Sequence, residues 1–357
     1  MVNVDLLVAG CDTRCRHCYV NGGPMPRMET ADALLCIERL DAASALLAEE
    51  TNFTLDHEPM AHPEIERILA TAAATKHIRY YHHGMTTGVA LMRRADRDAV
   101  LDRYFAIGCS WFGLTVHGGE ALHDEIVRRK GAFQSLLKAG EFLKARGAEL
   151  EVSLMLNRFF PENADAISKL LDRLQPDRVL LVIPIATPHA HMADFDPYRP
   201  TFDTADALVP YLSAWRQNAD EWIAQARNST VSAALYTLET VDLHELFRKE
   251  QGEKYLCVHP DRRLFLGNSG AETQCLGDIL CLDPAQIADA IRSMPDNRDY
   301  GAFYDVNALP DADALKAALL GLPQNELYGD FPSVLYKGLD ALGISTKILD
   351  LKGTACC

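Results

Sequence analysis

Close to its start the chain carries the stretch Cys11-Asp12-Thr13-Arg14-Cys15-Arg16-His17-Cys18, which directly follows an apolar run at residues 4–9. The apolar run is typical of a buried strand, and the C-x3-C-x2-C spacing lets one compact loop turn three sulfurs toward one centre. Thiolates are soft ligands that suit iron–sulfur clusters or zinc. Because a cubane cluster on three cysteines leaves one iron without a protein ligand, the stretch predicts a centre that binds a further molecule.

A structural zinc knuckle, with His17 as the fourth ligand, is the alternative interpretation of this stretch. Structural zinc sites usually combine two paired knuckles within a small fold. The chain has 357 residues and no second knuckle beside the first. The spacing therefore favours the cluster.

Composition and charge exclude several classes of protein. The net charge is −15, from 35 basic and 50 acidic side chains, whereas a nucleic-acid surface needs a basic stripe. No apolar run approaches the roughly 20 residues that cross a bilayer. The start of the chain lacks the basic region of a signal peptide. We therefore expect a cytoplasmic protein with neither a nucleic-acid nor a membrane partner.

Strands and helices alternate along residues 1–187. Strands are expected at 4–9, 52–55, 77–81, 111–116, 150–156 and 179–185, and helices at about 30–47, 63–75, 98–106, 133–146 and 164–174. This order predicts a parallel sheet with helical crossovers, here a partial (β/α)6 TIM-like barrel. Polar residues follow the strand ends, where barrels carry their chemistry: His57, His83, His117 and Asn157.

The cysteine stretch, the barrel pattern and Glu58-Pro59 at the end of the second strand together resemble the radical S-adenosylmethionine (radical SAM) superfamily over residues 3–187. The resemblance implies a [4Fe–4S] cluster on Cys11, Cys15 and Cys18, whose open iron chelates S-adenosylmethionine. It also implies reductive cleavage of a carbon–sulfur bond, giving a 5′-deoxyadenosyl radical that abstracts a substrate hydrogen.

The same resemblance implies a set of cofactor-binding residues. The superfamily usually carries Gly-Gly-Glu-Pro at the end of the second strand, where this chain has Asp56-His57-Glu58-Pro59. Glu58 is expected to bind the amino group of the cofactor, while the loss of both glycines puts the close backbone approach in doubt. The remaining candidates are His17, Tyr19, His83, His117 and Asn157. For each of the strand-end candidates alone, a hydrogen-bonded polar residue at the barrel rim is the alternative.

A late cysteine-bearing segment resembles a degenerate SPASM/twitch extension. It holds Cys257, a hairpin with its turn at 261–263, and then Cys275 and Cys281. Gly267 lies where the second cysteine of the hairpin is expected. We predict an auxiliary iron–sulfur cluster on the three cysteines; a twitch-like fold without a cluster is the alternative. The predicted domains are the barrel at 1–187, a linker and helical segment at 188–252 with a helix at 205–227, and the extension at 253–357.

The other cysteines divide into two kinds. Cys36 and Cys109 lie in apolar surroundings, where free cysteine packs as a small hydrophobe. Cys356 and Cys357 end the chain and are candidate catalytic thiols, as a ligand, a hydrogen-atom donor or a binding group. A tail without function is the alternative for this pair.

The expected function is that of a radical SAM enzyme acting on a small metabolite or a peptide, as in natural product biosynthesis. Its reducing partner is expected to be a protein such as flavodoxin or ferredoxin. Transfer of the aminocarboxypropyl group of the cofactor is one alternative reaction. A non-catalytic iron–sulfur electron carrier is the alternative from another class.

Overall fold

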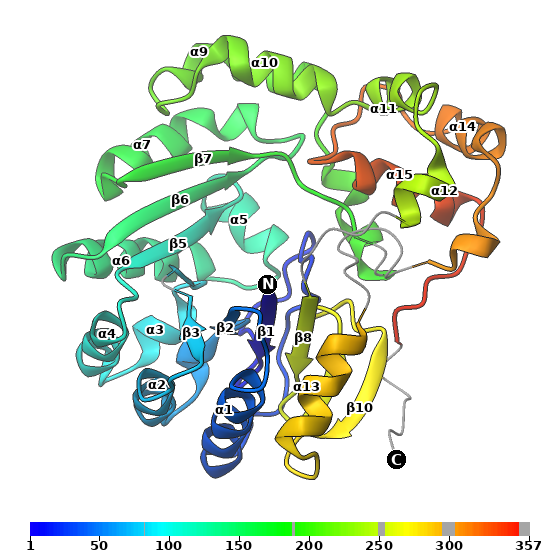
Figure 1. Ribbon diagram of the computed structural model, residues 1–357. Helices are drawn as coiled ribbons and strands as arrows, with labels where there is room; N and C mark the ends of the chain where they lie inside the picture. Colours follow the sequence, from blue (N-terminus) through cyan, green and yellow to red (C-terminus); the bar gives the residue numbers. More distant parts are fainter. Residues whose placement is uncertain (82, 188–189, 249–253, 295–303, 350–357) are drawn as a thin grey trace.

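The computed structural model describes residues 1–81, 83–187, 190–248, 254–294 and 304–349 (Figure 1). The strands of the barrel are β1 (Val2–Leu6), β2 (Thr51–Leu55), β3 (Ile78–Tyr80), β4 (His83–Met85), β5 (Trp111–Val116), β6 (Glu149–Met155) and β7 (Arg178–Val182). The helices between them are α1 (Thr30–Ser44), α2 (Ile65–Ala73), α3 (Val89–Arg93), α4 (Arg97–Ala106), α5 (Glu120–Ile126), α6 (Ala132–Ala145) and α7 (Ala164–Leu174). All these strands pair in parallel.

The strands line the inside of a partial barrel and the helices cover its outside (Figure 1). In β1, the alternating residues Val2, Val4 and Leu6 are buried in the same apolar core as Ile37 and Leu40 of α1. This alternation leaves Asn3 and Asp5 on the opposite face, because successive side chains of a strand point to opposite sides. The predicted (β/α)6 TIM-like barrel is confirmed.

The third predicted strand, at residues 77–81, corresponds to β3. The prediction missed β4, which follows at residues that were expected to lie beyond the strand end, and β3 and β4 belong to different sheets. β3 pairs with β2 and β4 pairs with β5. The first strand also lies earlier than predicted, at Val2–Leu6 instead of residues 4–9. The apolar residues that follow Leu6 belong to the loop that leads into the cysteines, and they are buried there.

The late segment continues the barrel sheet. It forms β8 (Lys254–Val258), β9 (Arg263–Leu266) and β10 (Gln274–Asp278), giving the order β10-β9-β8-β1-β2-β3. β8 pairs in parallel with β1, with Asp5 opposite Cys257, and β8 and β9 form the predicted antiparallel hairpin. Figure 1 shows β8 beside β1. Two segments 250 residues apart therefore meet at the strand that leads to the cysteine loop.

The remainder of the described chain is mainly helical. Its helices are α8 (Phe202–Asp206), α9 (Val209–Leu212), α10 (Ala219–Asn228), α11 (Val231–Thr237), α12 (Leu243–Arg248), α13 (Pro284–Ser293), α14 (Ala312–Leu320) and α15 (Phe331–Ala341). The single helix predicted at 205–227 is wrong. It is divided into α8, α9 and α10. The break between α9 and α10 arises because Arg216 adopts a left-handed backbone and Asn218 caps a new helix by accepting from the backbone of Asp220 and Glu221. No helix in the described ranges is long and apolar enough to cross a membrane.

Candidate iron–sulfur and cofactor site

The loop between β1 and α1 brings the sulfurs of Cys11 and Cys18 together. A Cβ atom added at Gly22 would lie 3.2 Å from the Cys18 Sγ and 3.3 Å from the Cys11 Sγ. The backbone N–H of Gly22 also donates to the Cys18 sulfur at 3.0 Å. A side chain at Gly22 would therefore enter the space between two candidate ligands. The convergence of the sulfurs, and the glycine beside them, fit a cluster held by this loop.

Backbone hydrogen bonds fix the loop to the end of α5. The N–H of Arg14 donates to the Val127 carbonyl at 3.1 Å, and that of Arg16 to the Ile126 carbonyl at 3.0 Å. Cys15 lies between these anchors and packs against a small apolar cluster that contains Val127. The position of the cysteines is thus set by the fourth β/α unit of the barrel as well as by β1.

Burial raises the pKa of all three thiols, that of Cys15 to about 12. The neighbouring thiols raise the pKa of Cys11 and Cys15 further, as does Glu58 for Cys11. The three groups thus lie within electrostatic range of one another. Since metal ligation needs thiolates, cluster assembly at this loop must release protons.

At the end of β2 one residue has a backbone conformation that could not be predicted from the sequence. His57, which stands in place of a glycine of the family pattern, has a φ of 65°, in the left-handed region that glycine favours. Its ring contacts Asp56 at 3.3 Å and lies beside the cysteine loop near Gly22. The conformation expected of the glycine is therefore kept although the residue has changed.

Glu58 is fully buried and its carboxylate is tied to the segment after β4. Thr86 donates its hydroxyl to Oε1 at 2.9 Å, and Thr87 donates its backbone N–H and its hydroxyl to Oε2, each at 2.7 Å. Burial raises the pKa of Glu58 despite these three donors. Thr86 and Thr87 were missed at the sequence level; a pair of hydroxyls just past the third strand was the available signal.

Three imidazoles form a row behind the cysteine loop. The ring centroids of His17 and His117 are 4.4 Å apart, and those of His117 and His123 are 5.3 Å apart. His117 and His123 are buried, and burial lowers the pKa of both rings, that of His123 to about 4. Asn157 is fully buried and donates its amide to the His117 carbonyl at 2.8 Å. Asn157 thus holds the end of β5 in place.

The other predicted cofactor-binding residues differ in how far they are exposed to solvent. Tyr19 is half-exposed on the cysteine loop. The His83 ring packs against Trp111, with ring centroids 4.8 Å apart. Cys36 and Cys109 are fully buried in the core, as predicted. The predicted catalytic pair, Cys356 and Cys357, lies outside the described residues.

The late cysteines do not come together in the described part of the chain. Phe265 of β9 lies opposite Cys257 on one side and Cys275 on the other, so these cysteines are two strand spacings, about 10 Å, apart. Cys281 is exposed after β10. The ligand atoms of Cys257 lie instead with those of His259 and Glu272, all within 4.8 Å of one another. Sequence analysis missed both of these partners.

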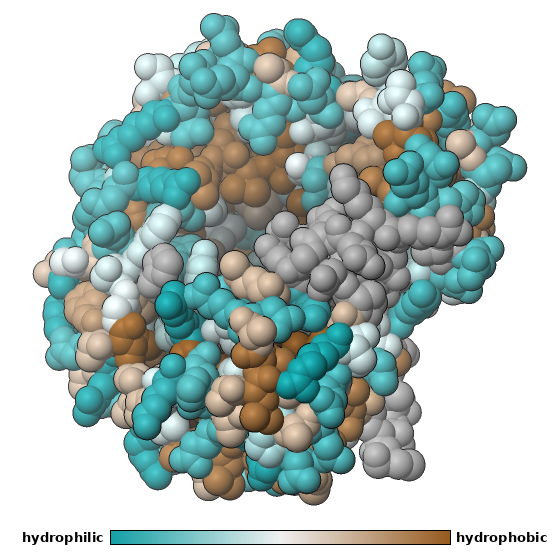
Figure 2. Space-filling model, in the orientation of Figure 1, coloured by the Kyte–Doolittle hydropathy of each residue, from teal (hydrophilic) through white to brown (hydrophobic). Residues whose placement is uncertain are grey.

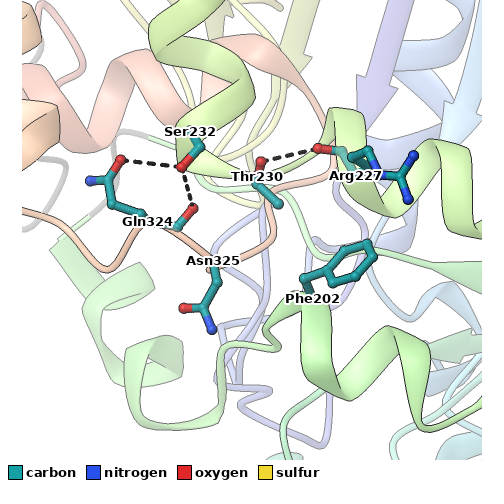
Figure 3. A pocket seen from close by; sticks show the side chains of 6 residues that line it. All are labelled: Phe202, Arg227, Thr230, Ser232, Gln324 and Asn325. Atoms are coloured by element: carbon teal, nitrogen blue, oxygen red, sulfur yellow. Dashed lines mark hydrogen bonds between the residues drawn. The ribbon is translucent and has the colours of Figure 1, made fainter.

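A pocket of about 320 Å³ lies elsewhere, in the helical part of the chain. It is lined by Phe202, Arg227, Thr230, Ser232, Gln324 and Asn325 (Figure 3). Its hydroxyls are already paired, since Thr230 donates to the Arg227 carbonyl and Ser232 to the Gln324 carbonyl. None of the predicted site residues lines it. The hollow in the face of the molecule seen in Figure 2, with hydrophobic residues along its upper wall, belongs to the barrel side instead.

A barrel with three cysteines in the loop after its first strand, two of whose sulfurs lie beside Gly22, is typical of one class of iron–sulfur protein, and comparison with known families agrees with this. Residues 6–174 match the model of the Radical SAM superfamily. This domain of the chain is therefore a radical SAM domain. Its cofactors are therefore a [4Fe–4S] cluster and S-adenosylmethionine, on which the superfamily relies. No curated protein matches the chain.

Solved structures share the fold at low sequence identity. One is native anSMEcpe with bound AdoMet and Cp18Cys peptide, at 12% identity and a TM-score of 0.53, covering 96% of each chain. Another is Streptococcus suis SuiB bound to the precursor peptide SuiA, at 9% identity and a TM-score of 0.54, covering 93% of this chain and 75% of SuiB. At these identities the likeness concerns the fold.

Proposed function

We propose that the protein is an enzyme that reductively cleaves S-adenosylmethionine and starts radical chemistry on a peptide or a small metabolite. The observation that carries the proposal is the meeting of the Cys11 and Cys18 sulfurs beside Gly22, within the domain that matches the superfamily. A [4Fe–4S] cluster held there by Cys11, Cys15 and Cys18 supplies one electron to the bound cofactor. The protein contributes ligation, orientation and exclusion of water.

The residues around the loop have distinct proposed roles. Glu58 offers buried carboxylate oxygens, which suit the amino group of the cofactor. His57 brings a left-handed backbone next to the cysteine loop, and this geometry is compatible with backbone contacts to the same group. His17 and Tyr19 flank Cys18 and are proposed to cover the cluster or the adenine. His83, His117 and Asn157 remain proposed ligands of the ribose and carboxylate.

The class of substrate is proposed from the structural neighbours. SuiB is bound to a precursor peptide, and anSMEcpe to a peptide. Both cover most of this chain, including its extension, which supports a peptide above a small metabolite. The electron is proposed to come from a protein such as flavodoxin or ferredoxin.

The domain division at residues 187 and 252, a cytoplasmic location and catalysis by Cys356 and Cys357 stay predictions. The auxiliary cluster predicted on Cys257, Cys275 and Cys281 is left out of this proposal, because Cys257 and Cys275 lie about 10 Å apart across β9 and Cys281 is exposed. Aminocarboxypropyl transfer is the second candidate reaction and differs in the carbon–sulfur bond that is cleaved.

The test is anaerobic reconstitution with iron and sulfide, followed by reduction in the presence of S-adenosylmethionine. We expect 5′-deoxyadenosine from the wild type and from Cys109→Ala, which removes a buried thiol far from the loop. We expect none from a triple alanine variant at Cys11, Cys15 and Cys18. Methylthioadenosine in place of deoxyadenosine would indicate aminocarboxypropyl chemistry. A reconstituted cluster that cleaves no cofactor would indicate an electron carrier.

A further inference from the structure

A second group of potential metal ligands lies at the end of β8. It consists of Cys257, His259 and Glu272, whose ligand atoms all lie within 4.8 Å of one another. Cys257 is fully buried and Glu272 is 2% exposed. The His259 Nε2 lies 2.6 Å from the Glu272 Oε1. One sulfur, one ring nitrogen and one carboxylate thus converge in a site that is closed on most sides.

The fold brings the three ligands together through the hairpin and the loop that follows it. Cys257 and His259 lie at the end of β8, while Glu272 returns on the loop between β9 and β10. Gly267 opens this loop with a φ of 110°, and a Cβ there would lie 2.4 Å from the Ala271 carbonyl oxygen. A glycine is therefore required for the tight turn that directs Glu272 back onto the hairpin.

The chemistry of these three side chains indicates which kind of metal ion they would bind. Buried carboxylates and thiolates are unfavourable unless they are paired or bind a metal. Thiolate, imidazole and carboxylate are the ordinary ligands of Zn²⁺. One thiolate, one carboxylate and one neutral imidazole together carry two negative charges, which neutralise a divalent cation. An iron–sulfur cluster, by contrast, is normally held by several thiolates, and this group has one.

We propose that Cys257, His259 and Glu272 bind one divalent transition-metal ion, with Zn²⁺ as the best match. Three protein ligands leave the fourth position of a tetrahedral ion open to water or to a group of the substrate. In the metal-free chain the His259 Nε2 and the Glu272 Oε1 form a hydrogen bond with each other. The proposal does not depend on the proposed reaction.

The metal site would be joined to the cysteine loop by the loop that carries Glu272. Ser269 donates its hydroxyl to Asp56 at the end of β2, and its N–H to Asp5 of β1 at 3.3 Å. Gly270 packs so closely that its Cβ would lie 2.6 Å from the Val20 backbone. The N–H of Gly270 donates to the Glu272 Oε1 at 3.0 Å. An ion on Glu272 would therefore order the segment that contacts the loop of Cys18.

The experiment uses the full chain with Cys11, Cys15 and Cys18 changed to alanine, so that the first loop contributes no thiols. We expect this variant to retain one zinc per chain after dialysis, and to bind Co²⁺ with a thiolate-to-cobalt charge-transfer band. Adding Glu272→Gln or His259→Gln should weaken Co²⁺ binding by at least about 100-fold, since changes of outer-shell residues alone cost 10–100-fold. Adding Cys257→Ser should remove the charge-transfer band.

The matched control is Cys281→Ser in the same background, which removes an exposed thiol near the hairpin and should change neither stoichiometry nor spectrum. The melting temperature should rise with added zinc in the parent and not in the Glu272→Gln variant, which keeps the shape of the side chain. Zinc or cobalt binding that is indifferent to Glu272→Gln and His259→Gln would overturn the proposal. So would iron and sulfide in place of zinc. Because no outcome involves cofactor cleavage, failure here is distinguishable from failure of the proposed function.

Discussion

The ends of β1 and β8 lie side by side in one sheet, yet they present different sets of ligands. After β1 a loop gathers three thiols, two of which meet beside Gly22. At the end of β8 a single thiol meets an imidazole and a carboxylate, and the other late cysteines lie two strands away or on the surface. The number of cysteines in a segment is thus a poor guide to its metal chemistry. What matters is which ligands the backbone turns toward one point.

The two regions also differ in the interactions that fix their backbones in place. The cysteine loop is anchored by backbone hydrogen bonds to residues 126 and 127 at the end of α5. The late group is held by its own antiparallel hairpin and by the loop from Gly267 to Glu272. Changes to α5 should therefore affect the first region, and changes to the hairpin loop should affect the contact between the two.

The largest effect is expected from a single ligand of the first region. Cys18→Ala should reduce formation of 5′-deoxyadenosine to the level of the triple alanine variant, because each thiolate of a three-cysteine site is needed to hold the cluster. The measurement is deoxyadenosine per chain together with iron content. Cys36→Ala, a buried thiol in the core, is the control and should keep both. Activity that survives Cys18→Ala would break the assignment of the three thiols to one cluster.

The next effect concerns the contact between the regions. Gly270→Ala and Gly131→Ala introduce the same methyl at the same φ of 79°, but only Gly270 faces the Val20 backbone, since nothing lies within 4 Å of Gly131. Gly131→Ala should cost about 1–2 kcal/mol of stability for the left-handed backbone. Gly270→Ala should cost a further 1–3 kcal/mol or so for overpacking. Urea unfolding of both variants measures the difference, and equal losses would mean that the loops separate freely.

The barrel could be predicted from sequence because its signals are local. Apolar runs, helical spacing and strand-end polar residues occur in order along the chain, and the strands and helices follow that order. The separate strand β4 could not be predicted, because His83, Gly84 and Met85 have neither an apolar run nor an alternating pattern. Pairing of β8 with β1 was also not visible, since it joins segments 250 residues apart whose hydrogen bonds are made by backbone alone.

The candidate sites divide in the same way. Cys11, Cys15 and Cys18 could be found because the ligands share one short loop. Glu272 could not be joined to Cys257, because the tight loop after Gly267 brings it back from a different strand. A histidine two residues after a cysteine at a strand end, as in Cys257 and His259, was the signal that could have suggested a mixed-ligand site.

The first region should contribute to the pH dependence of stability through its buried histidines. Burial lowers the pKa of His123 from 6.5 to about 4, so the native protein binds this proton less readily than the unfolded chain. The stabilising contribution is full above pH 6.5 and is lost as the pH falls toward 4. At about 1.4 kcal/mol per pKa unit the loss is at most about 3.5 kcal/mol.

His123→Phe tests this origin, since it removes the titrating ring and keeps an aromatic contact with Phe133. Chemical denaturation at pH 4.5 and 7 should show a smaller loss for the variant than for the wild type. Part of the loss should remain, because burial also lowers the pKa of His117. Identical pH profiles for the two proteins would mean that the acid-sensitive group lies outside α5. The first region would then have no acid sensitivity of its own that distinguishes it from the late group.

The smallest effect is expected at the late cysteines outside the mixed-ligand group. Cys275→Ser and Cys281→Ser should leave the iron and sulfide content of the reconstituted wild-type background unchanged, because Cys275 lies about 10 Å from Cys257 across β9 and Cys281 is exposed. The measurement is iron and sulfide per chain for each variant, with Cys109→Ala as the control. A loss of about four irons in either variant would show that the late cysteines do assemble a cluster. The hairpin would then have to open to bring Cys275 and Cys257 together. Both regions would in that case bind iron–sulfur clusters.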